Sequence, residues 1–217
     1  MLSDVMEDYL KAIYVLQTEN GPPVSTSDIA KEVEKTSPTV TDMLGKLADR
    51  GLIDREPYTG VELTPEGEAV ALEVVRHHRL LEAYLAEHLD YDWSEVHEEA
   101  ERLEHHISEE FERRVAAALD DPDVDPHGDP IPSADLEPVS DDSVGLAECS
   151  PGDHVVITRV SDRDDEELAY LSEAGLTPGT EIEVRDVAPF GMITVHTPAG
   201  EQSLPEEIAD SIRVRSA

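Results

Sequence analysis

The chain has 217 residues, which is enough for one large domain or two to three small ones. It contains 16 Lys and Arg against 51 Asp and Glu, so its formal net charge of −35 excludes nucleic-acid binding through bulk positive charge. Binding to DNA through a small local surface is compatible with this charge. Only four of the cations are Lys, and scarce Lys with such a surplus of acids is typical of cytosolic proteins of extreme halophiles.

The cysteine count and the hydropathy pattern limit the class of protein further. The single Cys149 excludes a disulfide framework and a multi-cysteine zinc site. The first residues, MLSDVMEDYLKAIY, carry acids where a signal peptide needs cations. No apolar run approaches the roughly 18 residues of a membrane span. We therefore expect a cytoplasmic protein without a membrane partner.

Residues 1–72 have the pattern of a winged helix-turn-helix DNA-binding domain. Apolar residues at helical spacing predict a helix over 4–18, which the segment NGPP ends. A second helix begins at Ser25, and a third runs over 37–50 with a Ser-Pro start. The segment LIDREPYTGVEL (52–63) predicts two short strands around a turn, which would form the wing.

Residues 73–119 are expected to form a helical metal-binding and dimerisation domain. A long helix is predicted from Pro65 to about Leu89, and another from about Ser94 to Leu119. The second of these helices carries one apolar stripe, which we interpret as core packing and in part a dimer seam: Val96, Ala100, Leu103, Ile107, Phe111 and Val115.

A proline-rich and acidic linker is predicted over 120–145, and its segment DPHGDPIP is expected to be extended and locally packed. Residues 146–217 change to a β pattern, with the runs HVVITRV, EIEVRDV, MITVH and IRV and one helix at 165–174. About five short strands in this length favour a small SH3-like barrel. The predicted fold is therefore mainly α with a small β domain at the C-terminal end.

A group of histidines and carboxylates has the spacing of metal ligands. His97, Glu101, Glu104 and His105 fall on one face of the predicted 94–119 helix, and His78 and Glu82 form an i, i+4 pair on the preceding helix. Asp8 adds a carboxylate if the first helix packs nearby. Such ligands without thiolate suit Mn²⁺, Fe²⁺ or Zn²⁺. In a chain this acidic, however, such pairs also arise by chance on solvated faces.

The other candidate groups are interpreted as structural or solvated. Cys149, in or beside the linker, is expected to be a bystander thiol. The remaining histidines are expected to be structural or exposed: His77, His88, His106, His127, His154 and His196. Four glutamates are interpreted as solvated surface: Glu98, Glu99, Glu109 and Glu110.

Several segments along the whole chain resemble the diphtheria-toxin-repressor family of metal-dependent transcription regulators. The most specific are EDYLKAIY (7–14), SPTVTDMLGKLADRGLI (37–53), HRLLEAYL (78–85), VHEEAERLEHHISEEFERR (96–114) and DPHGDPIP (125–132). The tail LSEAGLTPGTEIEV (171–184) resembles the ferrous-transport-protein-A-like barrel that such regulators often carry. The resemblance implies a homodimer that binds a double-stranded DNA operator when it holds a divalent metal ion.

The resemblance also implies two metal sites. The first matches Asp8, Glu101, Glu104 and His105, and the second matches His78, Glu82 and His97, with Asp164 and Glu167 near the positions at which barrel residues complete it in some members. Iron-responsive members use Met and Cys where this chain has Asp8 and Glu101. Oxygen in place of sulfur shifts the preference toward Mn²⁺ over Fe²⁺. Lys11 replaces a ligand Glu of the shorter manganese regulators, which favours two separated sites over a close metal pair.

The helix over 37–50 is expected to be the recognition helix, which contacts DNA. Small hydroxyl side chains and Pro38 can reach phosphates or thymine methyl groups, and Asp42 stands where iron-responsive relatives have Gln, which favours an altered operator preference. The residues expected to face DNA bases are Thr36, Ser37, Pro38, Thr39, Thr41 and Asp42. Phosphate contacts are expected from Lys31, Lys35, Lys46, Arg50 and Arg55, although such cations also occur as ordinary surface ion pairs.

These patterns together predict a repressor of metal-homeostasis genes that Mn²⁺ clamps into its DNA-binding form. An Fe²⁺-responsive regulator of the same family is the nearest alternative. A metallohydrolase is a remote one, because the sequence offers no phosphate loop, nucleophile elbow or HExxH motif. A winged-helix regulator that senses no metal is a third alternative.

Overall fold

The computed structural model describes residues 2–56, 59–137, 142–189 and 191–217, and these residues form two compact units. The first unit consists of Met1–His77 with two short segments, Glu104–Ile107 and Pro132–Pro138. The second unit consists of His78–Leu103, Ser108–Ile131 and Val139–Ala217. The chain therefore leaves the first unit at His77 and returns to it twice.

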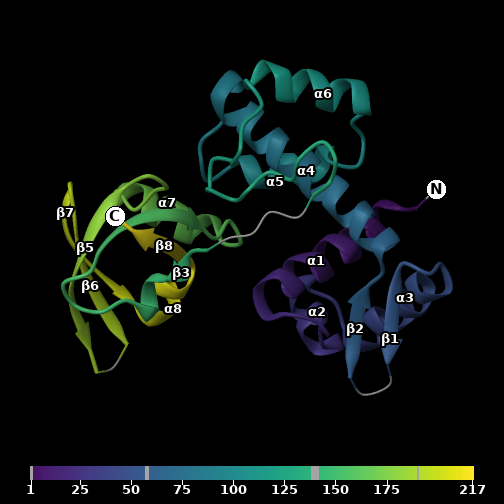
Figure 1. The fold of residues 1–217 in the computed structure, drawn as a ribbon, viewed down its shortest axis with the longest axis horizontal. Helices are drawn as coiled ribbons and strands as arrows, with labels where there is room; N and C mark the ends of the chain where they lie inside the picture. The colour runs from purple at the N-terminus through teal and green to yellow at the C-terminus, as the bar shows by residue number, and fades with distance from the viewer. Residues whose placement is uncertain (1, 57–58, 138–141, 190) are drawn as a thin grey trace. The chain divides into compact units, whose positions relative to one another are not determined.

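The first unit is a winged helix-turn-helix, as predicted (Figure 1). Its helices are α1 (Asp4–Asn20), α2 (Thr26–Glu32) and α3 (Ser37–Asp49). They pack around fully buried aliphatic side chains: Leu10, Ile13, Ile29, Val40, Leu44 and Leu47. The Ser25 hydroxyl accepts a hydrogen bond from the backbone N–H of Asp28 and so caps α2.

The wing is a two-stranded antiparallel hairpin of β1 (Ile53–Glu56) and β2 (Gly60–Leu63), in which Ile53 lies opposite Leu63. Two residues of the predicted turn, Pro57 and Tyr58, lie outside the described residues. An isolated bridge between Val24 and Val61 joins the segment before α2 to β2, so the wing is tied to the helices.

The long helix α4 (Pro65–Leu89) is confirmed, but the predicted continuous helix over 94–119 is wrong. The chain forms α5 (Val96–Leu103) and α6 (Glu109–Ala118), separated by a turn. The Ser108 hydroxyl accepts from the N–H of Phe111 at 3.3 Å, and three glutamates follow in the first turn of α6, so a new helix begins there. Phe111 is exposed, and the predicted apolar stripe does not continue through it.

The segment after α6 lies against two regular elements of the second unit. The Arg79 guanidinium of α4 donates to the Pro130 carbonyl, and the Val160 N–H of β4 (His154–Val160) donates to the His127 carbonyl. Gly128 has φ of +89°, and a Cβ there would lie only 1.9 Å from the Thr158 carbonyl oxygen. Glycine is therefore required for this close approach to β4.

The C-terminal part is a six-stranded antiparallel sheet in the order β3-β8-β4-β5-β6-β7, consistent with the predicted SH3-like barrel (Figure 1). Its remaining elements are β3 (Val144–Gly145), the short helix η1 (Leu146–Glu148), α7 (Asp165–Glu173), β5 (Glu181–Ala188), β6 (Met192–Thr197), β7 (Gly200–Pro205), α8 (Glu206–Asp210) and β8 (Ile212–Ser216). The sequence GEQSLP of β7 was not predicted as a strand, because Leu204 is its one large aliphatic residue and the segment has no alternation of apolar and polar residues.

None of the helices in the described part of the chain is long and apolar enough to span a bilayer.

Candidate metal centres

The first cluster of potential metal ligands lies within the first unit. It consists of Asp8 from α1 with Glu104 and His105 from the turn after α5. His105 Nε2 lies 2.8 Å from Asp8 Oδ1 and 3.4 Å from Glu104 Oε1. Because α5 ends at Leu103, Glu104 and His105 lie in the following turn, and both side chains can contact α1. The contact between His105 and Asp8 joins residues that are 97 positions apart in the sequence.

Two further side chains hold this cluster in place. His105 Nδ1 donates to Glu7 Oε2 at 2.8 Å, which leaves Nε2 directed at Asp8. His77 Nδ1 donates to the backbone carbonyl of Glu104 at 3.0 Å. Burial alone lowers the pKa of His105, but the hydrogen bond to Glu7 and the charges of Glu104 and Asp8 outweigh it and raise that pKa. A carboxylate behind a ligand histidine is the usual orienting partner in metal sites.

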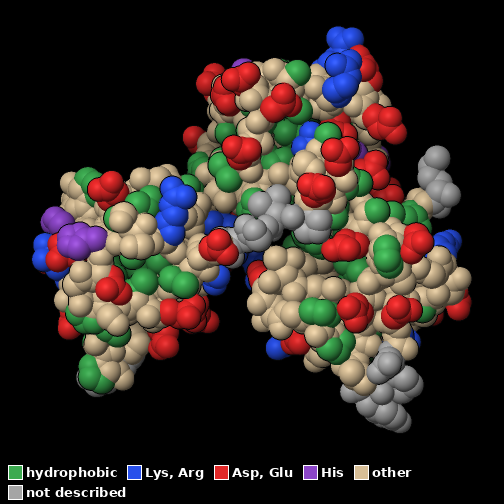
Figure 2. Space-filling model, viewed as in Figure 1, with side chains coloured by type: hydrophobic (Ala, Val, Ile, Leu, Met, Phe, Trp, Pro, Cys, Tyr) green, Lys and Arg blue, Asp and Glu red, His purple; other side chains and the backbone are tan. Residues whose placement is uncertain are grey.

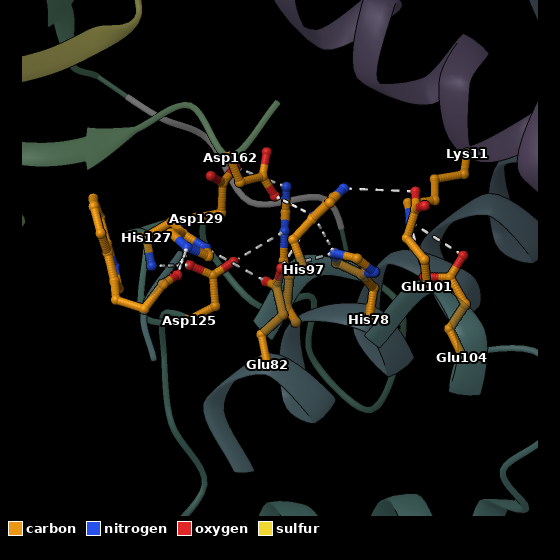
Figure 3. Close-up of polar contacts among 12 residues, drawn as sticks. Lys11, His78, Glu82, His97, Glu101, Glu104, Asp125, His127, Asp129 and Asp162 are labelled. Carbon is orange, nitrogen blue, oxygen red and sulfur yellow. Dashed lines mark hydrogen bonds and ion pairs between the residues drawn. The ribbon is translucent and has the colours of Figure 1, made fainter. Parts of the chain in front are cut away.

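Lys11 also contacts this cluster. Its Nζ lies 2.8 Å and 3.1 Å from the two carboxylate oxygens of Glu104, which is only 2% exposed (Figure 3). Lys11 follows Asp8 by three residues on α1, so both side chains lie on the same face of that helix. The sequence identified Lys11 as a departure from the manganese regulators, and the structure shows which ligand it contacts.

The place of Glu101 in the first site stays a prediction. Glu101 lies on α5 in the second unit, 56% exposed, with Oε1 at 3.6 Å from His97 Nε2. Among the described residues, the ligand atoms that lie within 4.8 Å of one another in the first cluster are those of Asp8, Glu104 and His105. The sequence placed His97, Glu101, Glu104 and His105 on one continuous helix face, and the break after Leu103 separates them into two pairs.

The second cluster lies within the second unit and joins His78 and Glu82 of α4, His97 of α5 and Asp162 of the loop after β4 (Figure 3). Glu82 Oε1 lies 3.0 Å from His78 Nε2 and 3.3 Å from His97 Nδ1. Asp162 Oδ2 lies 3.1 Å from His97 Nδ1. The predicted His78, Glu82 and His97 are thus brought together, and Asp162 is a fourth side chain that the sequence did not identify.

The barrel residues predicted near this cluster have other roles. Asp164 caps α7, because its Oδ1 accepts from the N–H groups of Glu166 and Glu167 at 2.9 and 3.0 Å. The Glu167 carboxylate accepts a hydrogen bond from the hydroxyl of Ser211. Asp164 and Glu167 are therefore not among the side chains that converge in the second cluster, whereas Asp162, two residues before Asp164, is among them. The N-cap preference of Asp before the helix at 165 was the available signal.

His127 adjoins the second cluster, although it was predicted to be structural or exposed. It is fully buried, and its Nε2 donates to the Trp93 carbonyl at 2.9 Å. Its Nδ1 lies 3.7 Å from Glu82 Oε2, and neither atom has a hydrogen-bond partner among the described residues. Asp125 completes a second group of three with these two residues. Two buried acceptor atoms that face each other fit a cation or a proton between them.

The charges of the second cluster fit a cation as well. Burial lowers the pKa of His97 and of His127. Hydrogen bonds to Asp162 and Glu82 outweigh burial at His97, and the proximity of the Glu82 carboxylate with the charge of Asp125 outweighs it at His127, so these pKa values are raised to about 10 and about 9. Burial raises the pKa of Glu82, but the charge of His78 and hydrogen bonds from the imidazoles hold it well below its usual value. Without a metal, protons on the histidines therefore balance the buried carboxylates.

Both clusters offer carboxylate oxygen and imidazole nitrogen, without sulfur. Such donors suit Mn²⁺, Fe²⁺ and Zn²⁺. The residues present therefore fit a divalent transition-metal ion.

All predicted DNA-facing residues on and before α3 are exposed. Lys46 Nζ lies 2.7 Å from Asp42 Oδ2, and Lys31 Nζ lies 3.9 Å from Asp28 Oδ1, so both lysines also form local surface ion pairs. Figure 2 shows Asp and Glu side chains in many separate groups on the visible surface, with fewer Lys and Arg. The contact of the exposed α3 face with DNA stays a prediction.

Family models cover almost the whole chain. The model for the N-terminal DNA-binding domain of iron-dependent repressors matches residues 1–61, and the one for their metal-binding and dimerisation domain matches 64–133. The FeoA domain model matches 144–216. The chain belongs to the iron-dependent repressor family. This family consists of metal-dependent transcriptional repressors, and the resemblance to the diphtheria toxin repressor inferred from the sequence is confirmed.

The relatives of this repressor include iron- and manganese-dependent members. The iron-dependent repressor IdeR of Mycobacterium tuberculosis is 34% identical over 226 residues, covering 98% of this chain and 97% of the relative. A solved manganese-dependent transcriptional repressor in complex with manganese has a TM-score of 0.92 and 38% identity, covering 98% of this chain and 100% of the other. ScaR with bound Zn²⁺ has a TM-score of 0.85 and 33% identity, covering 98% and 99%.

Proposed function

We propose that this chain is a Mn²⁺-responsive, homodimeric repressor that acts on DNA in the cytoplasm and is not an enzyme. The observation that most directly supports this proposal is the first cluster, in which Asp8 of α1 contacts His105 beside Glu104 without any sulfur donor. Oxygen donors in place of sulfur shift the preference of such a site toward Mn²⁺. The relative in complex with manganese supports the same choice.

In this proposal the ligands of the first cluster control the position of α1. When bound, a divalent cation supplies positive charge that offsets the repulsion between Asp8 and Glu104. Glu7 holds the proton on His105 Nδ1 and thereby keeps Nε2 directed at Asp8. Asp8 then anchors α1 to the segment Glu104–Ile107. Because α1 shares one hydrophobic core with α2 and α3, that anchor also restrains the recognition helix.

The second cluster has a supporting role in the proposal. His78, Glu82, His97, Asp162 and His127 would hold a second divalent ion, and Asp125 lies close enough to Glu82 and His127 to contribute. Glu101 is retained as a proposed additional ligand of the first cluster, on the basis of the family resemblance. Its side chain is 56% exposed, and its Oε1 lies 3.6 Å from His97 Nε2.

Dimer formation is proposed through the helices of the second unit. Leu89 at the end of α4 and Phe111 on α6 are large apolar side chains that are 53% and 44% exposed, and a dimer formed through these helices would cover them. The matched family model describes residues 64–133 as a metal-binding and dimerisation domain. A two-fold dimer would present two α3 helices to half-sites about 34 Å apart.

The deciding experiment is DNA retention by chelator-stripped protein, titrated with Mn²⁺ and, separately and anaerobically, with Fe²⁺ in high-potassium buffer. The probe is DNA from upstream of metal-uptake genes. We expect retention only with metal, at lower Mn²⁺ than Fe²⁺ concentrations. A lower midpoint for Fe²⁺ would favour the iron-responsive alternative, which the match to iron-dependent repressors makes the second candidate.

Three variants make this titration specific. Glu104→Ala is expected to abolish the metal response, and Glu101→Ala to weaken it if Glu101 is a ligand. Glu110→Ala is the matched control, because Glu110 is exposed on α6 and pairs only locally with Arg113 and Arg114. Retention that ignores both the metal and Glu104→Ala would leave a winged-helix regulator that senses no metal.

A further inference from the structure

We propose that Lys11 is a tethered competing cation that sets the metal concentration at which the first cluster responds. This inference rests on the proposed function, because it assigns a role to a residue beside the regulatory ligands. Lys11 would not be a ligand, since an ammonium group has no lone pair to donate. It would act through Glu104, the most deeply buried of the three ligands.

The geometry of the contact supports a strong interaction. Lys11 Nζ reaches both carboxylate oxygens of Glu104, at 2.8 and 3.1 Å. The Glu104 side chain is 2% exposed and that of Lys11 is 17% exposed, so solvent screens this pair little. The contact joins residues 93 positions apart, and Lys11 is therefore placed there by the fold and not by helical spacing.

Figure 3 shows the Lys11 side chain extending from α1 toward Glu104. The ammonium group therefore lies on the same carboxylate that the ion would use. His105 Nε2 lies 3.4 Å from Glu104 Oε1, so the oxygen that faces the cluster is also one that Lys11 contacts. An ion that binds Asp8, Glu104 and His105 must share Glu104 with Lys11 or displace Lys11 toward solvent.

Either outcome weakens metal binding relative to a neutral residue at position 11. If the ammonium stays, it repels the ion at close range, where solvent screens the two charges little. If it leaves, the buried ion pair with Glu104 is lost. In both cases the protein without metal is stabilised by Lys11, and the metal-bound protein is not stabilised to the same degree.

An exposed pair on the same unit provides the matched control. Lys46 lies 2.7 Å from Asp42, but the two side chains are 51% and 71% exposed and are four residues apart on α3. Such a pair contributes little and is screened by salt. Replacing Lys46 removes one positive charge from the first unit without touching the ligands. It therefore separates an effect of net charge from an effect of the Lys11–Glu104 contact.

The experiment compares Lys11→Met, Lys11→Gln, Lys11→Arg and Lys46→Met in the full-length Asp162→Asn background, in which the second cluster lacks one ligand. Bound Mn²⁺ is obtained from the electron paramagnetic resonance signal of the free ion, and DNA retention is titrated in parallel. We expect both neutral variants at position 11 to lower the half-saturating Mn²⁺ concentration at least about tenfold. Lys11→Arg and Lys46→Met are expected to bind Mn²⁺ with midpoints within about twofold of the parent. Lys46→Met serves as the control for Mn²⁺ binding alone and is left out of the DNA titration, because Lys46 is also an expected phosphate contact.

The outcomes separate this inference from the proposed function. An unchanged or higher Mn²⁺ midpoint in both neutral variants would overturn the role of Lys11 while leaving metal sensing intact. A parent protein that binds no Mn²⁺ sensitive to Glu104→Ala would overturn the proposed function itself. Thermal unfolding adds a second readout: the neutral variants should be less stable than the parent without metal and should gain more stability on adding Mn²⁺. Equal gains would contradict the inference.

Discussion

The two ligand clusters differ in burial and in how their charges are balanced without a metal. In the first cluster Asp8 is 48% exposed, and a lysine on the same helix contacts Glu104. In the second cluster Glu82 is fully buried and His78 is 5% exposed, and protonated imidazoles balance the carboxylates. A cluster with one exposed carboxylate, Asp8, suits exchange of an ion with the surroundings, whereas a cluster around the fully buried Glu82 suits an ion that stays once bound. We therefore expect the first cluster to sense the ion and the second to stabilise the fold.

The largest expected difference between the clusters is in folding stability. Glu82→Ala leaves His78, His97 and His127 without their shared buried carboxylate, so we expect the metal-free protein to lose about 3 to 5 kcal/mol. Asp8→Ala removes a partly exposed carboxylate and is expected to cost less than about 1 kcal/mol. Urea unfolding of both variants measures this. Equal losses in the free energy of unfolding would show that the second cluster does not stabilise the fold more than the first.

The second expected difference is in the dependence of stability on pH. In the folded, metal-free protein the pKa values of His97 and His127 are raised to about 10 and about 9, above the ordinary value of 6.5. Their contribution to stability is therefore fully present below pH 6.5 and is lost as the pH rises through 9 to 10. Unfolding at pH 6.5, 8 and 9.5 should show this loss, and His97→Gln should reduce it. Saturating metal should abolish it, because ligand histidines carry no proton on the donor atom.

A smaller effect is expected from the residue that orients His105. Glu7→Gln weakens the hydrogen bond that fixes the imidazole, so we expect the Mn²⁺ midpoint for DNA retention to rise about tenfold. Because the pKa of His105 is raised, a proton competes with Mn²⁺ for Nε2. We therefore also expect Mn²⁺ binding to weaken as the pH falls. Glu62→Gln on the exposed face of β2 is the control. If Glu7→Gln matches that control, Glu7 does not position the ligand.

The smallest expected effect distinguishes two neighbouring aspartates of the second cluster region. Asp164→Ala removes the N-cap of α7, which should cost about 1 kcal/mol and leave metal binding unchanged. Asp162→Ala should instead lower the number of ions bound per chain, measured by metal analysis after gel filtration. A reversed result would return Asp164 to the ligand set that the sequence predicted.

The sequence predicted the elements whose signals are local. Helix α3 begins at its Ser-Pro dipeptide, and α4 ends at Leu89, because caps and apolar periodicity are written in neighbouring residues. The break after Leu103 was missed, since the apolar stripe continues through it at helical spacing. Its local signal was Ser108 followed by two glutamates, a typical helix start.

The ligand clusters were predictable only in part, because they combine distant segments. His78 and Glu82 are an i, i+4 pair, and any helix brings them together. Asp162 and His127 enter the second cluster through the packing of a loop and an extended segment that carry no periodic pattern. Nothing in the spacing of His127 distinguishes it from the five other histidines that were interpreted as structural or exposed.

Gly128 has a consequence for genetics. A Cβ added at residue 128 would lie only 1.9 Å from the Thr158 carbonyl oxygen, and the positive φ of +89° would add backbone strain. The displaced segment carries His127, whose imidazole faces Glu82, so the damage would reach the second cluster without altering any of its side chains. We expect Gly128→Ala to behave as a conditional allele, repressing at low temperature and derepressed when the culture is warmed.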